Sequence, residues 1–259
     1  WTISAADGDQ IQQADRRVSG GGHATYTRAF DSRLGHAELT AGLQARHDQV
    51  RVRLLNTVRR EPKDKSDDLG RPIPAQVYDT RINETSLAPF LETRLQLTPW
   101  MRAVAGARAD AIRMDVAAGY AENSGTRQAV IGSPKASLVF GPWRRTEVYA
   151  NAGLGFHSNH AAGVMQRVDP VTGTPLRYDG TIVSRTPPLV RTRGAELGLR
   201  TQPGRQAQTS LALWFLGSES ELLYTPEDGF TSPERPGRRL GLEWLNYLRL
   251  RPWLAMDFD

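Results

Sequence analysis

The sequence predicts an all-β protein: an antiparallel transmembrane β-barrel, of which about ten strands are present. Three observations predict this fold. Apolar and polar residues alternate with a period of two in one segment after another. Short turns that contain proline alternate with long polar connections. Tryptophan follows the proline at three of these turns, which places three aromatic rings at one common level.

Composition excludes several other classes. The 259 residues fit one large domain or two small ones, and the 33 basic against 28 acidic residues give a net charge of +5. Acidic residues interleave with the arginines, so no run is typical of nucleic-acid binding and we expect no nucleic-acid partner. No stretch approaches the ~18 apolar residues of a membrane-spanning helix, whereas barrel strands are only half apolar. With no cysteine, the chain has no disulfide, thiol nucleophile or cysteine-based zinc site.

The alternation defines the strands in order. From Ala37 to Arg46 the odd positions are apolar and the even positions mostly polar, and 146–156 shows the same pattern with its apolar row on the even positions. Segments 85–97 and 102–114 also have helical features, but Pro89 argues against a helix interior and the neighbouring segments are strands. The expected strands are 24–30, 37–58, 85–97, 102–114, 133–140, 145–156, 189–201, 206–217, 238–250 and one that begins at Leu254.

Proline marks the expected hairpin turns. These are Thr98-Pro99-Trp100, Gly141-Pro142-Trp143, Arg251-Pro252-Trp253 and, without tryptophan, Gln202-Pro203-Gly204. The long connections are expected at 61–82, 116–132, 157–188 and 218–237. Barrels in outer membranes have short periplasmic turns and long outer loops. Trp100, Trp143 and Trp253 are therefore expected at the membrane interface, with the ring buried and the indole N–H in water.

The two ends of the chain differ. Residues 1–22 show no clear alternation and include Ser19-Gly20-Gly21-Gly22, so we expect a loop remnant there and a partial barrel domain over 23–259. The last expected strand stops in mid-pattern at Asp259. Because a barrel must close to avoid lipid-exposed edges, we expect further strands beyond both ends.

Three segments resemble TonB-dependent outer-membrane receptors. Residues 153–163, GLGFHSNHAAG, resemble the strand-to-loop motif of that family, and residues 188–198, PLVRTRGAELG, are similar to the strand that follows it. Residues 84–90 followed by Thr98-Pro99-Trp100 are similar too, and the order of the motifs over most of 23–259 makes the resemblance specific. His160 and Ala162 stand where many relatives have Asp and Arg, so a salt bridge is not carried over.

The resemblance implies a 22-stranded barrel with a plugged lumen in the outer membrane of a Gram-negative bacterium, of which this chain is a middle-to-late part. The implied function is capture by the outer loops and energised import of a ferric siderophore or similar chelate. The implied partners are outer-membrane lipid and a TonB-type energising protein, which acts through a plug domain that this chain lacks. Cobalamin, haem and saccharides remain open as substrates, because loops and plug determine ligand choice. Neither catalysis nor a resident cofactor or metal is expected.

The loops at 157–188 and 218–237 supply the candidate ligand-binding residues, and Arg191 and Arg193 lie at the start of the strand between them. These two arginines can attract carboxylate or phosphate groups of a ligand or of lipopolysaccharide, although exposed rim charge is the alternative. The candidates are His157, Asn159, His160, Arg167, Tyr178, Arg191, Arg193 and Tyr224.

Other functions stay open. Ser158 with a neighbouring histidine suggests a hydrolase, but adjacent strand residues point to opposite faces and pair poorly. His157 and His160 can contact a metal chelate, yet no acidic cluster completes a metal site. A passive porin or smaller closed barrel and a soluble β-rich binding module are the remaining alternatives. The lumen-facing charges, expected mainly to form mutual ion pairs, are Glu38, Arg46, Glu92, Arg94, Lys135, Glu147, Glu196 and Arg200.

Overall fold

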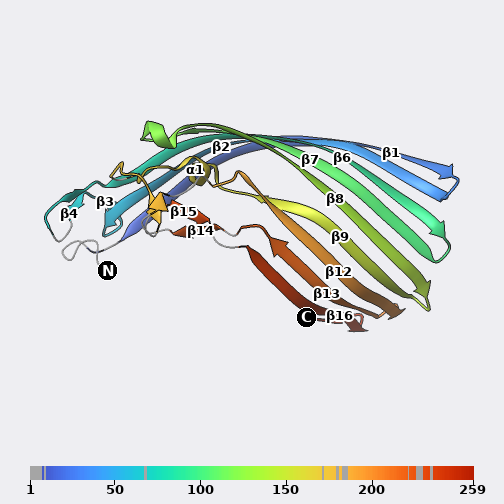
Figure 1. The fold of residues 1–259 in the computed structure, drawn as a ribbon. Helices are drawn as coiled ribbons and strands as arrows, with labels where there is room; N and C mark the ends of the chain where they lie inside the picture. The colour runs from blue at the N-terminus through green and yellow to red at the C-terminus, as the bar shows by residue number, and fades with distance from the viewer. Residues whose placement is uncertain are drawn as a thin grey trace.

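One large antiparallel sheet dominates the computed structural model, which describes residues 8, 10–66, 69–170, 172–178, 181–182, 186–220, 222–225, 230–233 and 236–259. Its main strands follow one another in chain order, and β3 pairs with β2 beside this path. Figure 1 shows them as a curved wall, with short turns at one end and α1 and the small hairpins at the other. Strands β1 and β17 lie at opposite edges, so the described sheet does not close into a barrel.

The ten main strands are β1 (Ile11–Ser32), β2 (Gly35–Val58), β6 (Gln76–Thr98), β7 (Met101–Ala117), β8 (Gly125–Trp143), β9 (Thr146–Ser158), β12 (Leu189–Gly204), β13 (Ala207–Ser218), β16 (Gly237–Arg251) and β17 (Leu254–Phe258). The short elements are β3 (Glu61–Pro62), β4 (Lys65–Ser66), β5 (Pro72–Ile73), β10 (Arg177–Tyr178), β11 (Thr181–Ile182), β14 (Leu222–Thr225), β15 (Phe230–Pro233), η1 (Ala121–Asn123) and α1 (Ala161–Met165). No helix in the described ranges is long and apolar enough to cross a membrane.

All ten expected strands are confirmed, but several are longer than the sequence pattern predicts. The expected loop over 1–22 is wrong for residues 11–22, which form the first half of β1. Alternation is hard to see there because this half is mostly polar on both faces and contains three consecutive glycines. The connections expected at 61–82 and 116–132 are shorter, since β6 begins at Gln76 and β8 at Gly125.

The proline turns lie at the expected end of the sheet, with two corrections. Pro142 and Pro203 lie within the last residues of β8 and β12, at shifts in the strand register, and the turns follow at 144–145 and 205–206. A register irregularity tolerates a residue that lacks an N–H. Arg144 and Arg145 both have positive φ, 49° and 66°, as a type I′ hairpin requires.

The three tryptophans gather at this turn end, and the membrane interface stays a prediction for them. The rings of Trp100 and Trp143 stack with centroids 6.3 Å apart, and both are about half exposed. Trp253 lies on the β16–β17 turn and is more exposed still.

Cross-strand register places the apolar rows on one face, which we call the outer face. Leu197 is opposite Leu213, and Leu213 is opposite Leu242. Leu91 of β6 is likewise opposite Ala41 of β2 and Ala107 of β7. Directly opposite residues in antiparallel strands point to the same side. Alternation within each strand therefore continues across the sheet as one broad apolar band.

The polarity of the two faces inverts part of the way along β2. From Ala37 to Ala45 the outward residues are apolar, a length close to the ~9–11 residues that a tilted membrane strand needs. From His47 to Arg53 the outward residues are polar, and Val50, Val52 and Leu54 are buried on the opposite, inner face. The same strand thus has an apolar outer face near the turns and an apolar inner face near the long loops.

Aromatic rings on the inner face cover glycines of the adjacent strand. Phe90 is opposite Gly42, Tyr149 opposite Gly198, and Trp214 opposite Gly241. A Cβ added at Gly198 would lie 2.2 Å from Cζ of Tyr149, so the ring occupies the volume that a side chain would take. Such pairs fix strand register.

We predict that Gly198→Ala destabilises the protein by about 1–3 kcal/mol, because the new methyl group displaces the Tyr149 ring. Gly194→Ala is the matched control on the same strand and face, since its Cβ would meet only the Phe215 carbonyl oxygen at 3.8 Å. Lower entropy of the unfolded chain leaves the control neutral or slightly stabilised. Urea unfolding of the complete gene product in lipid vesicles measures both, and equal stability of the two variants would contradict the prediction.

Candidate ligand-binding site

The connection after β9 folds back over the inner face of the sheet. Its helix α1 places Val164 and Met165 against Val52, Met114 and other apolar residues from β2, β6 and β7. Met114 and Val164 are almost completely buried. Removing this apolar surface from water stabilises the packed arrangement by about 25 cal/mol per Å². The inversion of polarity along the strands therefore creates the apolar surface on which the loop packs.

Two buried asparagines fasten this loop. The Asn123 Oδ1 atom accepts hydrogen bonds from the backbone N–H groups of Arg167 (2.8 Å) and Val168 (3.0 Å), and its Nδ2 donates to the Val168 carbonyl (2.9 Å). Asn159 donates from Nδ2 to the Pro187 carbonyl at 2.6 Å. The first contact ties the loop to the β7–β8 connection, and the second joins the beginning and end of the loop.

A pocket of about 600 Å³ lies beside the folded loop. Its lining comes from the start of β1, the start of β6, the β7–β8 connection and residues 158–170. The polar and aromatic lining residues include Asp15, Arg17, Tyr78, Tyr120, Ser158, Asn159 and His160. This volume is in the range of small-molecule sites.

The pocket carries charge of both signs. Loss of water around its ring and the positive charge of Arg17 lower the pKa of His160, against the smaller opposing effect of Asp15. His160 is therefore neutral at pH 7 and can both donate and accept a hydrogen bond. Arg17 brings a permanent cation with five N–H donors to the same pocket.

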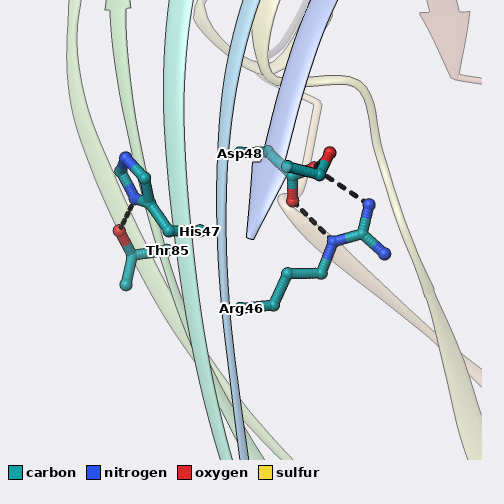
Figure 2. Close-up of polar contacts among 5 residues, drawn as sticks. Arg46, His47, Asp48 and Thr85 are labelled. Carbon is teal, nitrogen blue, oxygen red and sulfur yellow. Dashed lines mark hydrogen bonds and ion pairs between the residues drawn. The ribbon is translucent and has the colours of Figure 1, made fainter. Parts of the chain in front are cut away.

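Alternation on β2 separates the inner polar groups from the outer ones. Arg46 Nε donates to Asp48 at 2.7 Å, and Ser19 of β1 also hydrogen-bonds to Asp48. His47 points to the opposite face, where its Nδ1 lies 2.8 Å from the hydroxyl of Thr85 (Figure 2). The Arg46–Asp48 pair lies on the same inner face as Arg17, whereas His47 lies on the outer face.

The structure brings together only part of the predicted ligand set. Asn159 and His160 line the pocket, and His157 lies nearby at the end of β9, opposite Val190. Arg167 is exposed on the loop. Arg191 and Arg193 lie in the row of Leu197 on the outer face, and Arg191 Nη1 donates to the Gly132 carbonyl at 2.8 Å.

Tyr178 of β10 and Tyr224 of β14 have side chains outside the described residues. A ligand-contact role stays a prediction for all eight positions.

Sequence reasoning missed the contribution of β1. Asp15 and Arg17 lie in the segment that the sequence predicts to be a loop remnant, because the three consecutive charged residues Asp15, Arg16 and Arg17 hide the alternation of the strand. The sequence pattern predicts Tyr78 and Tyr120 inside long connections, and only the fold brings them beside His160. No polar–apolar alternation marks Asp15 and Arg17 in the sequence, so no local signal identifies them.

Ion pairs cover the inner wall nearer the turns. Glu92 pairs with Lys135 at 2.6 Å and with Arg94 at 3.2 Å, and Arg94 also reaches Glu38 at 3.5 Å. Glu147 binds Arg102 and Arg200 at 2.8 and 2.5 Å. The expected mutual pairing of inward charges is thus observed for Glu38, Glu92, Arg94, Lys135, Glu147 and Arg200.

Ser158 and the potential metal ligands of the described part of the chain are the groups on which a catalytic or metal site would depend. No hydrogen bond of the described residues joins Ser158 to a histidine, as an activated nucleophile requires. Within the same residues, no group of three or more His, Asp or Glu side chains is placed to hold a metal ion.

The fold has the features of part of a large β-barrel wall: ion pairs on the inner face nearer the turns, an apolar outer band, and loops gathered at one end (Figure 1). The sequence matches the family of TonB dependent receptor-like β-barrels over residues 2–247. The chain therefore belongs to the TonB-dependent receptor β-barrel family, which consists of transport receptors. No curated protein matches the chain.

Several solved structures share the fold at low identity. The ferric yersiniabactin uptake receptor of Yersinia pestis is 14% identical with a TM-score of 0.65, and the match covers 95% of this chain and 35% of that one. The outer-membrane receptor for alcaligin of Bordetella pertussis is 14% identical with a TM-score of 0.60, over 93% of this chain and 38% of that one.

The ferripyoverdine receptor of the outer membrane of Pseudomonas aeruginosa is 15% identical with a TM-score of 0.67. The match covers 95% of this chain and 32% of that one. The chain thus spans about a third of the length of these receptors.

We predict that Asn123→Ala releases the loop from the β7–β8 connection. The substitution removes three hydrogen bonds, each with a net value of about 1 kcal/mol, so local opening becomes on the order of 100-fold more frequent. Hydrogen exchange of a peptide that covers residues 161–170 measures the change. Asn83→Ala, an exposed asparagine on the outer face, is the control and should leave this exchange unchanged. Unaltered exchange in Asn123→Ala would show that apolar packing alone holds the loop.

Proposed function

We propose that this chain forms part of an outer-membrane receptor that captures a metal chelate and imports it with energy from a TonB-type partner. The observation that carries the proposal is the pocket at the loop end, open on the inner side of a wall whose outer side is apolar. A ligand caught there lies on the route through the barrel, inside the level of the outer loops.

Membrane placement follows from the outer band. Leu43, Leu87, Leu91, Leu211 and Leu213 remain exposed on this face, which a protein in water would have to cover. A lipid bilayer satisfies the same surface, and Trp100 and Trp143 then lie at its inner boundary. The proposed location is the outer membrane of a Gram-negative bacterium.

The chemistry of the pocket favours an anionic chelate with aromatic or carbonyl groups. Arg17 supplies a guanidinium that can bind a carboxylate or another anionic oxygen with two N–H groups. Tyr78 and Tyr120 add aromatic surface, and neutral His160 adds hydrogen-bonding capacity. Two of the solved relatives are named for ferric chelates, which agrees with a ligand of this kind.

The test uses the complete gene product in cells that lack their own ferric-chelate receptors. We expect uptake of radiolabelled iron from at least one member of a panel of ferric chelates, and loss of this uptake when the energising protein is deleted. Uptake that persists without the energising protein would instead support a passive channel. No binding of any chelate by the purified protein would remove the capture proposal.

We predict that Arg17→Gln weakens binding of the anionic chelate about tenfold, because it removes the cation from the pocket. Arg16→Gln is a stringent control, since this substitution removes the same charge from the adjacent residue, which faces the opposite side of β1. Titration calorimetry with the purified protein compares the two. Equal affinity in both variants would place the ligand elsewhere.

A further inference from the structure

A row of arginines crosses the outer face of three adjacent strands. Arg16 of β1 is directly opposite Arg51 of β2, and Arg51 is directly opposite Arg81 of β6. All three are exposed, and opposite residues point to the same side of an antiparallel pair. Arg53 lies two residues further along β2 on the same face. We call Arg16, Arg51, Arg53 and Arg81 the arginine row.

The row is only partly neutralised. Arg51 Nε donates to Asp79 of β6 at 2.8 Å, and Asp79 is opposite Arg53. A further acid of the described residues on this face, Asp115 of β7, accepts a hydrogen bond from Arg113 at 2.9 Å. The ion pairs of the described residues include no partner for Arg16, Arg53 or Arg81. Four guanidinium groups therefore share one carboxylate.

Such a row destabilises the sheet unless an anion joins it. Like charges directly opposite each other in a sheet repel, and these strands lie only about 5 Å apart. Guanidinium groups bind phosphate oxygens in a bidentate manner, and several of them can share one phosphate. The arrangement is consequently a binding surface for a compact, multiply charged anion.

The height of the row above the apolar band restricts the anion further. Arg51 lies six residues beyond Ala45, the last residue of the band on β2, which corresponds to about 20 Å along the strand and roughly 14 Å along the normal of a membrane for a 45° tilt. Gln49 and Asn83, directly opposite each other, fill the interval with neutral hydrogen-bonding groups. The phosphate of an ordinary phospholipid lies at the edge of the band, below the row.

We propose that the outer face of β1, β2 and β6 binds a phosphorylated glycolipid of the outer leaflet. Its acyl chains lie on the apolar band, its sugars contact Gln49 and Asn83, and its sugar-bound phosphates reach the arginine row. The proposal rests on the proposed membrane location, but it requires neither the pocket nor import.

The experiment measures lipid binding by the complete gene product in detergent micelles. The test variant is Arg16→Gln/Arg53→Gln/Arg81→Gln, which leaves the Arg51–Asp79 pair intact. Arg33→Gln/Arg205→Gln/Arg251→Gln removes the same charge from exposed residues at the turn end and is the matched control. The probes are lipopolysaccharide, its dephosphorylated form, phosphatidylglycerol and inorganic phosphate.

We expect the parent and the control to bind lipopolysaccharide equally and the test variant to bind it at least about tenfold more weakly. Dephosphorylated lipid and phosphatidylglycerol should bind the parent no better than they bind the test variant. Millimolar inorganic phosphate should not displace the glycolipid. Because glutamine relieves repulsion in the row, the test variant should fold and retain chelate binding.

Three results would overturn the proposal. Unchanged lipopolysaccharide affinity in the test variant would show that the row is not the binding surface. Equal binding of dephosphorylated lipid or phosphatidylglycerol would exclude the sugar-bound phosphate as the group that the arginine row recognises. Displacement by inorganic phosphate would identify a soluble anion as the ligand instead. Since Arg17→Gln changes chelate binding and the test variant changes lipid binding, failure of one proposal leaves the other measurable.

Discussion

The pleat of the β-strand, held in register by antiparallel pairing, is the constraint on which the other features depend. Side chains alternate between faces with a period of two, and pairing satisfies the backbone polar groups inside the sheet. Nine successive strand pairs, from β1–β2 to β16–β17, keep this register with only local shifts, most of them near the turns and one at Leu54–Leu55 near the long loops. The apolar band, the ion pairs on the inner wall and the glycine–aromatic pairs all follow from it.

The same constraint lets one strand serve several surfaces. In β1, Arg16 and Arg17 are neighbours in the chain, yet one faces outward beside Arg51 and the other lines the pocket. In β2, Val52 supports the folded loop while Arg53, the next residue, belongs to the arginine row. No additional element is needed to keep the two surfaces apart, because adjacent residues of one strand point to opposite faces of the sheet.

Alternation and proline placement sufficed to predict all ten main strands, since the pattern is strong wherever one face is apolar and the other polar. They failed for residues 11–22, where both faces are largely polar, and for the starts of β6 and β8. The pocket was predicted only through Asn159 and His160. Arg17, Tyr78 and Tyr120 join it through contacts between distant segments, which no local pattern contains. The apolar inner surface on which the loop packs could not be predicted either. Val50 and Val52 follow the alternation of an ordinary strand, and only the structure shows that they are buried on the inner face.

At the proposed membrane location, the exchange of polarity between the faces also opposes movement of the wall along the membrane normal. Sinking deeper would carry Arg51 and Arg53 toward hydrocarbon, where a lipid-facing arginine costs about 2–4 kcal/mol at the midplane. Rising would lift Leu43 and Leu87 into water and draw the turns into lipid. Movement in either direction therefore costs free energy, so one position along the membrane normal is favoured. At the proposed location, the loop end is thereby held at a constant distance from the bilayer.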